Sequence, residues 1–89
     1  MLRTSNRNCG HLVENRILFK ANNIFSELHG ENYFVFSYGR HWILFAFVDG
    51  IWYENKDKYS QSTSKHRSQA RPAGVNTILV SKEAIHKLY

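Results

Sequence analysis

The chain has 89 residues, with 12 Lys and Arg against 7 Asp and Glu, so its formal net charge is +5. A chain this short predicts one domain with a dense core, and its basic balance favours nucleic acid, acidic protein surfaces or anionic lipid as partners. The single cysteine, Cys9, excludes an intrachain disulfide and favours a reducing compartment.

Residues 1–11 are polar, carry Arg3 and Arg7, and show no hydrophobic periodicity. They predict a flexible arm, since chain ends without apolar anchors are poorly ordered. The N-terminus has no apolar stretch of signal-peptide length, and the longest apolar run, Trp42–Val48, is too short to span a bilayer. We therefore expect a soluble cytoplasmic protein with no membrane partner.

Between Leu12 and Leu28 the spacing of apolar residues fits a helix and a strand about equally well. Asn22 and Asn23 favour a break, because Asn is common in turns. We expect an extended or irregular segment to about residue 21, followed by a strand over residues 24–29 and a turn at residues 30–32.

Both tryptophans and most phenylalanines and tyrosines fall within residues 33–53. Aromatic and β-branched residues suit strands, so this block predicts an antiparallel meander with strands at 33–38, 41–48 and 51–54. Asp49-Gly50 predicts a type I′ turn. Gly39-Arg40 predicts a two-residue loop, unless Gly39 is instead a bulge in a longer, bent strand.

These strands are apolar at successive positions, not only at alternate ones. A sheet with one face in water alternates apolar with polar residues, so both faces of this sheet should be covered. The flanking segments, a second copy or a partner could cover the second face.

Residues 55–74 are polar and rich in serine. Thr63 or Ser64 could cap a short helix that ends at Ala70, before Arg71-Pro72. With Ala70 as its one apolar residue, such a helix has little to bury, and a loop at 63–70 is the alternative.

Residues 75–80 predict a last strand, and Ser81 is expected to cap a helix over residues 82–88. The expected buried side of this helix is Ala84, Ile85, Leu88 and Tyr89, and it is the best internal cover for the sheet's second face. The predicted fold class is α+β: one domain, 1–89, with a small antiparallel meander sheet of three to five strands, a short polar helix or loop at 63–70 and a C-terminal helix.

The candidate binding surface combines the cations and hydrogen-bond donors of residues 58–71 with the turn near Gly39. Its members are Arg40, His41, Lys58, Tyr59, Ser64, Lys65, His66, Arg67, Gln69 and Arg71. Lys and Arg neutralise phosphates, hydroxyls donate to them, and exposed aromatic rings can stack on bases. The same cations suit an acidic protein surface, and a solvated polar loop is the simplest alternative. Replacing Lys65, Arg67 and Arg71 together should abolish binding without unfolding the sheet.

The histidines lie at positions 11, 29, 41, 66 and 86, a spacing that resembles no metal-ligand set. We expect no metal and no cofactor. The chain has no Walker loop, dinucleotide-binding pattern or nucleophile elbow. It is not predicted to be an enzyme, and the remaining alternative is a metal-free nuclease that uses His41 and His66.

Three blocks resemble small uncharacterised proteins of tailed bacteriophages: Phe36–Trp42, Trp52–Asn55 and Lys58–Pro72. The family pattern has an aromatic-Ser-Tyr-Gly-x-His-aromatic block and a Thr-Ser-Lys-His-x-x-Gln-x-Arg-Pro block. The likeness covers residues 33–72 and departs after Trp42, where the family tends to have Pro and this chain has Ile43. That departure favours a continuous strand from His41. The resemblance implies a phage or prophage gene expressed in a bacterial host cytoplasm, and it implies no established activity.

By analogy with other small phage proteins, our leading hypothesis is a non-catalytic binding module that inhibits or redirects a bacterial nucleic-acid-handling complex, in the manner of an anti-CRISPR protein. Its partner would be a host protein or nucleoprotein complex. The alternatives are a direct DNA- or RNA-binding protein that uses the 58–71 block, and a homodimeric structural phage protein.

Overall fold

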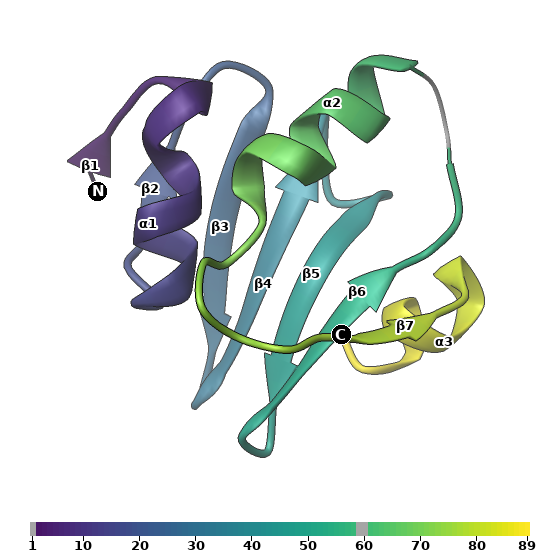
Figure 1. Ribbon diagram of the computed structural model, residues 1–89. Helices are drawn as coiled ribbons and strands as arrows, with labels where there is room; N and C mark the ends of the chain where they lie inside the picture. The colour runs from purple at the N-terminus through teal and green to yellow at the C-terminus, as the bar shows by residue number, and fades with distance from the viewer. Residues whose placement is uncertain (1, 59–60) are drawn as a thin grey trace.

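The computed structural model describes residues 2–58 and 61–89, which form one sheet with helices on both of its faces (Figure 1). In this described part the strands lie side by side in chain order: β1 (Leu2–Arg3), β2 (Phe19–Lys20), β3 (Ile24–His29), β4 (Asn32–Ser37), β5 (Ile43–Val48), β6 (Ile51–Asn55) and β7 (Ile78–Val80). The helices are the 3-10 turn η1 (Asn6–Asn8), α1 (Cys9–Glu14), α2 (Gln61–Ala70) and α3 (Lys82–Lys87).

The α+β class and the antiparallel meander are confirmed. Each strand from β2 to β5 pairs with the next in antiparallel orientation. Asp49 and Gly50 have φ values of 52° and 79°, as the predicted type I′ turn requires. Six residue pairs join β3 to β4, from Ile24↔Ser37 to His29↔Asn32.

The predicted three to five strands are too few, because the sheet has seven. The strands that were not predicted, β1 and β2, have two residues each, which is too short to show an alternation of apolar and polar side chains. The last strand, expected over 75–80, is limited to Ile78–Val80. Both edge strands run parallel to their neighbours, β1 to β2 and β7 to β6, and each is reached by a crossover that contains a helix.

Where the sequence predicts a flexible arm, the structure has regular elements: β1, η1 and the first residues of α1 lie within residues 2–11. Cys9 and Val13, four residues apart, bury one side of α1. Gly10 lets α1 approach α2 closely, since a Cβ there would lie 2.8 Å from the carbonyl oxygen of Arg71. Burial raises the pKa of the Cys9 thiol to about 11, so it stays protonated at neutral pH.

Residues 38–42 form a loop between β4 and β5, not the predicted two-residue turn followed by a continuous strand from His41. The strand begins at Ile43, and the Ser37 N–H donates to the Trp42 carbonyl at 3.0 Å across the base of the loop. Tyr38, not Gly39, has the left-handed backbone, with φ of 67°. The bulge in this strand pair lies between Val35 and Phe36, away from Gly39.

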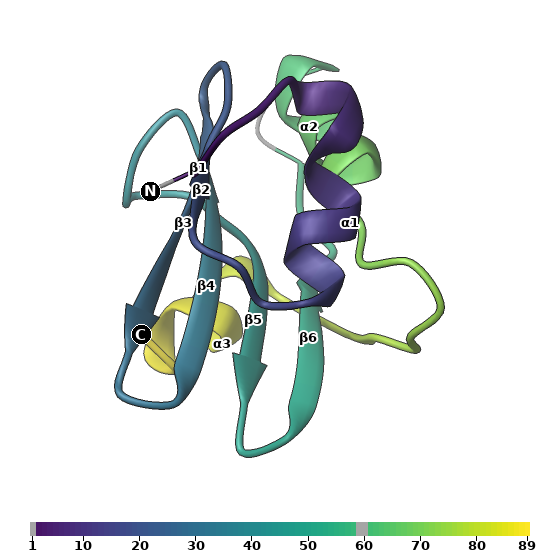
Figure 2. The same ribbon diagram turned by 90° about the vertical axis from the view of Figure 1, so that its left-hand side faces the viewer.

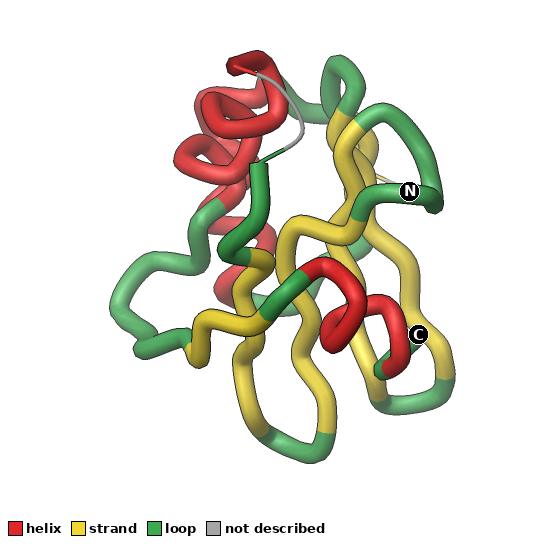
Figure 3. Tube along the Cα trace, turned by 90° about the vertical axis from the view of Figure 1, so that its right-hand side faces the viewer, coloured by secondary structure: helices red, strands yellow, loops and turns green. Residues whose placement is uncertain are grey.

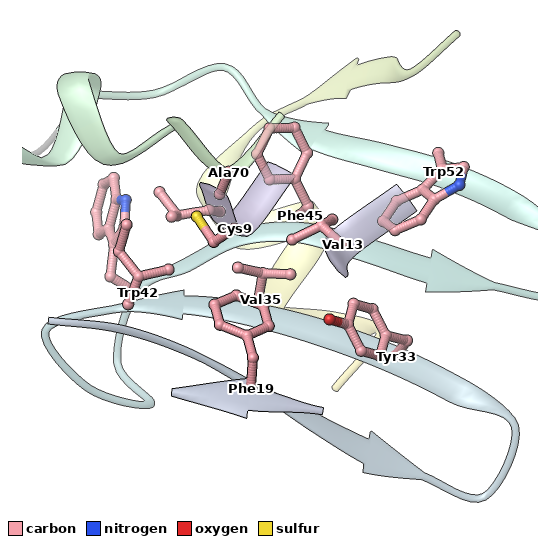
Figure 4. Packing of buried hydrophobic residues seen from close by; sticks show 11 residues of the cluster. Cys9, Val13, Phe19, Tyr33, Val35, Trp42, Phe45, Trp52 and Ala70 are labelled. Carbon is pink, nitrogen blue, oxygen red and sulfur yellow. The ribbon is translucent and has the colours of Figure 1, made fainter. Parts of the chain in front are cut away.

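The first face of the sheet packs against α1 and α2, as the edge-on view in Figure 2 shows. Its core contains Phe19, Tyr33, Val35, Phe45 and Trp52 from the strands, with Cys9, Val13 and Ala70 from the helices (Figure 4). Each of these large side chains contributes roughly 1.5–3 kcal/mol when fully buried. The flanking helices therefore supply much of the cover that a doubly apolar sheet needs.

The second face packs against α3, as predicted (Figure 3). Ile85 is buried against Phe34, Phe36 and Ala46, and the Ser81 hydroxyl oxygen accepts from the Ala84 N–H at 3.2 Å as the expected cap. The predicted buried side is right for Ile85 and wrong for Ala84, which is exposed. Tyr89 is partly exposed, yet its ring packs edge-on against Phe34 and Phe36.

None of the helices in the described ranges has the length and apolar composition to cross a membrane.

His86 links α3 to the sheet through an interaction that depends on pH. Its Nε2 accepts a hydrogen bond from the Ile43 backbone N–H at 3.1 Å, so protonation removes the acceptor. Burial first, and then the charges of Lys82 and His41, lower the pKa of His86, while Glu83 acts in the opposite sense. The pKa in the folded state thus lies below the unfolded value of about 6.5. Between the two values the unfolded chain binds more protons, so stability is lost as pH falls.

We expect the melting temperature to be lower at pH 5.5 than at pH 7.5, and the difference to shrink in His86→Gln. It should not vanish, because the pKa of His66 is also lowered by burial. Circular dichroism melts at the two pH values measure this, with the exposed His11→Gln as control. An equal pH difference in His86→Gln and His11→Gln would contradict the assignment.

Candidate functional site

The predicted 58–71 block divides into residues that hold α2 against the sheet and residues that face solvent. Tyr59 lies outside the described residues. Among the others, Arg67 and Arg71 point back to β6 and His66 points to β4. Lys58 and Lys65 are exposed, and Ser64 and Gln69 are half-buried.

Glu54 on β6 is 2% exposed and binds both arginines. Its two carboxylate oxygens accept from the Arg71 guanidinium at 2.6 and 2.7 Å, and Oε1 also accepts from the Thr77 hydroxyl at 2.6 Å. Arg67 Nε lies 3.5 Å from Oε2, and Arg67 Nη1 donates to the Asn55 carbonyl. Burial alone would raise the pKa of Glu54, but these hydrogen bonds and positive charges outweigh it and lower the pKa.

Arg67 and Arg71 are therefore structural cations. Both guanidinium groups pair with the Glu54 carboxylate and hold α2 against β6. The contacts reverse the expectation that replacing Lys65, Arg67 and Arg71 together leaves the fold intact.

His66 is also turned inward, so α2 meets the sheet through polar contacts. Its Nδ1 lies 2.8 Å from the Ser37 hydroxyl oxygen, and its ring centroid lies 5.1 Å from that of Tyr38. Burial, and then the charge of Lys65, lower the pKa of His66. Both Ser37 and His66 are buried, which leaves this pair without the access that a catalytic base needs.

Arg40 and His41, the predicted residues outside the block, lie on the β4–β5 loop, and cations gather on both sides of that loop. On one side Arg40 and Lys20 line one pocket together with Tyr38. The Tyr38 ring contacts His66, and the charge of Lys65 reaches His66. Lys20 and Arg40 are therefore neighbours beside Tyr38, and Lys65 directly precedes the histidine that the Tyr38 ring contacts.

On the other side of the loop, Lys82 Nζ lies 5.6 Å from the centre of the Trp42 ring. The charges of Lys82 and His41 both reach His86, which is bonded to Ile43. The Lys82 backbone N–H donates to Asp57 Oδ2 at 2.8 Å. Asp57 lies between two exposed lysines in the chain, so this bond brings them to the start of α3.

We name the resulting surface the basic end. It comprises the side chains of Lys20, Arg40, Lys56, Lys58, Lys65 and Lys82. Glu27, Asp57 and Glu83 partly offset its charge, and Glu27 forms an ion pair with Arg40. At the opposite end of the sheet the two hairpin turns carry the exposed acids Glu31 and Asp49. Arg16, over the Phe47 ring, offsets part of this negative charge, so the excess of positive charge lies at the basic end.

Sequence reasoning missed Lys20, Lys56 and Lys82, which are scattered along the chain and follow no motif. They come together because β2, β6 and α3 place them near one loop. In an antiparallel meander the end of every second strand lies at the same edge of the sheet. The end of the strand predicted over residues 51–54 therefore lies beside the loop near Gly39, and this signal could have identified Lys56. Nothing in the linear sequence relates Lys20 to Lys65.

No group of three or more His, Cys, Asp or Glu side chains within the described residues is placed to hold a metal ion.

The ion pairs of Glu54 predict that a conservative substitution of this residue lowers the stability of the fold strongly. Glu54→Gln removes the negative charge that pairs with Arg67 and Arg71 and keeps the side-chain shape. Breaking a buried ion pair costs about 3–5 kcal/mol, and the partial exposure of Arg71 reduces this to about 2 kcal/mol. We expect the melting temperature to fall by about 8–16 °C.

Thermal unfolding of Glu31→Gln supplies the matched control, because Glu31 is exposed in a turn and its loss should change stability by less than about 0.5 kcal/mol. Equal melting temperatures for the two variants would show that the Glu54 network does not hold α2 in place.

No protein-family model, curated protein or solved structure matches the chain. What the basic end can do chemically is therefore the basis for the functional inference.

Proposed function

We propose that this protein is a non-catalytic module that binds nucleic acid through the basic end. The observation that carries the proposal is that six Lys and Arg side chains from separate segments lie at the end of the sheet that carries the β4–β5 loop. Five of the six are exposed, and Lys82 is half-exposed. A patch assembled from distant parts of the chain cannot be explained as the solvated face of one helix.

The chemistry of the basic end suits a phosphate backbone. Lys and Arg neutralise phosphates and release counterions, which supplies most of the affinity of sequence-independent binding. The acidic turns at the far end would orient the molecule, because a polarised protein approaches a polyanion with its positive end.

The histidine contacts favour binding over catalysis. His66 is buried against Ser37 and Tyr38, and His41 lies on the side of the loop that faces His86. A metal-free nuclease would need two titratable groups directed at one phosphate. These two histidines are instead directed at different neighbours.

A second candidate is the inhibitor of a bacterial nucleic-acid-handling complex, in a phage-infected host cytoplasm. The edge strand β7 favours it, since Ile78 and Leu79 are 50% and 59% exposed and could add to a protein interface. The basic end would then meet an acidic protein face.

Salt dependence tests the nucleic-acid proposal. For single strands, log affinity falls with log salt at a slope of about −0.7 per neutralised phosphate. If the six side chains each meet one phosphate, the slope for a fluorescein-labelled oligonucleotide should be about −4. The triple variant Lys58→Gln, Lys65→Gln, Lys82→Gln should reduce its magnitude by about 2.

A matched pair of single variants removes one charge at the basic end or elsewhere: Lys65→Gln and Arg16→Gln. The Arg16 guanidinium lies over the ring of Phe47, near the β5–β6 turn at the opposite end of the sheet. Equal losses of affinity in these two single variants would reject the basic end as the site. A partner captured from nuclease-treated bacterial lysate, with no binding to oligonucleotide, would favour the inhibitor instead.

A further inference from the structure

We infer that the pocket beside Tyr38 is a nucleotide subsite, which takes one unstacked base and its phosphate from a single strand. The inference rests on the proposed function and deepens it, because it names single-stranded nucleic acid as the ligand. The basic end alone would bind single and double strands with little preference.

The pocket has the size and the charges for this ligand. Its volume is about 420 Å³, within the range of about 300–1,000 Å³ typical of small-molecule sites. Lys20 approaches from β2 and Arg40 from the β4–β5 loop, so two segments each supply a cation. Phe25 and Ile24 supply apolar lining between them.

Tyr38 provides an aromatic ring that is 47% exposed and held in place from behind. The ring contacts that of His66 at 5.1 Å between centroids, with an angle of 41° between the ring planes. An exposed ring whose rotation is limited by such a contact can stack on a base, which is how many single-strand binders hold their ligands. Stacking on this ring does not select a particular base, because every base has a π-face.

The backbone under this ring is strained at Tyr38. Its φ of 67° lies in the left-handed region, which bulky residues seldom adopt. The Tyr38 N–H donates to the carbonyl of another pocket residue, Asn23, at 2.9 Å. Asn23 has a φ of 63°, which its short polar side chain tolerates well. Such strain gathers at ligand sites, where it fixes a side chain in a useful direction.

The Arg40 side chain is also positioned before a ligand binds. Its Nε donates to Glu27, and its guanidinium lies 5.9 Å from the centre of the Phe25 ring. Because this ion pair uses Nε, the terminal nitrogens keep donors for a phosphate. A positioned guanidinium loses less conformational entropy on binding than a flexible one.

A second pocket on the described surface lacks this combination. It has a volume of about 470 Å³ and includes Arg7 and Arg71. Arg71 is bound to Glu54, and the one ring among the described residues that line it is the small imidazole of His11. This pocket therefore offers a base a smaller stacking surface than the Tyr38 ring does.

Three variants test the subsite against a labelled single-stranded oligonucleotide and a duplex of equal length. Tyr38→Ser should weaken single-strand binding about 5- to 100-fold, and Tyr38→Phe should restore it, because stacking needs the ring and not the hydroxyl. Duplex binding should change less than about 2-fold, because paired bases stay stacked. The salt slope of Tyr38→Ser should match the wild type, whereas Lys20→Gln should reduce its magnitude by about 0.7.

Calorimetric titration with adenosine 5′-monophosphate and with inorganic phosphate separates this inference from the proposed function. If the protein binds oligonucleotides and Tyr38→Ser binds them equally well, the subsite is wrong and the nucleic-acid function stands. If it binds no oligonucleotide at low salt, the proposed function fails, and mononucleotide binding that depends on Tyr38 would still support the pocket. Equal binding of phosphate and mononucleotide would overturn the role of the ring. Lys20 is exposed, so Lys20→Gln keeps the test valid should Tyr38→Ser fail to fold.

Discussion

One buried carboxylate, Glu54, determines how the polar part of the chain is arranged. α2 has only Thr63, His66 and Ala70 buried, so hydrophobic burial cannot fix its position. The bonds from Arg67 and Arg71 to Glu54 fix it instead, and Thr77 joins the following segment to the same group. With α2 held by its arginines, Lys65 is left on the outer side. The basic end therefore depends on an acid that lies beneath it.

The second constraint is the need to cover both faces of an aromatic sheet. The two crossovers place α1 and α2 on the first face, and the short α3 covers part of the second. The cover is incomplete near β7, where Ile78 and Leu79 are exposed. The apolar surface that is least covered thus lies at one edge of the sheet, on β7. This strand is far in sequence from the aromatic block of residues 33–53.

The meander and α3 could be predicted because their signals are local. Asp49-Gly50 specifies its turn by backbone conformation alone, and Ser81 specifies a helix start by one hydrogen bond. The N-terminal elements could not, because α1 has six residues and no side-chain hydrogen bond at its cap. It is stable through packing of Cys9 and Val13 against distant strands. The site was predicted only in part for a related reason. The sequence shows which residues are cations, but it does not show which of them pair with an acid far away in the chain. Arg71 is structural because it binds Glu54, and no local pattern indicates this pairing.

The parallel edge strands carry a consequence for the order in which the protein folds. Antiparallel neighbours in the meander meet after turns of a few residues, so closing them costs little chain entropy. Leu2 must find Phe19, and Tyr53 must find Ile78, across much longer segments. Contacts of long sequence separation form late, so the central hairpins are expected to condense first and both edges to close onto them. The basic end, built partly from late-closing segments, would be completed only in the last steps of folding.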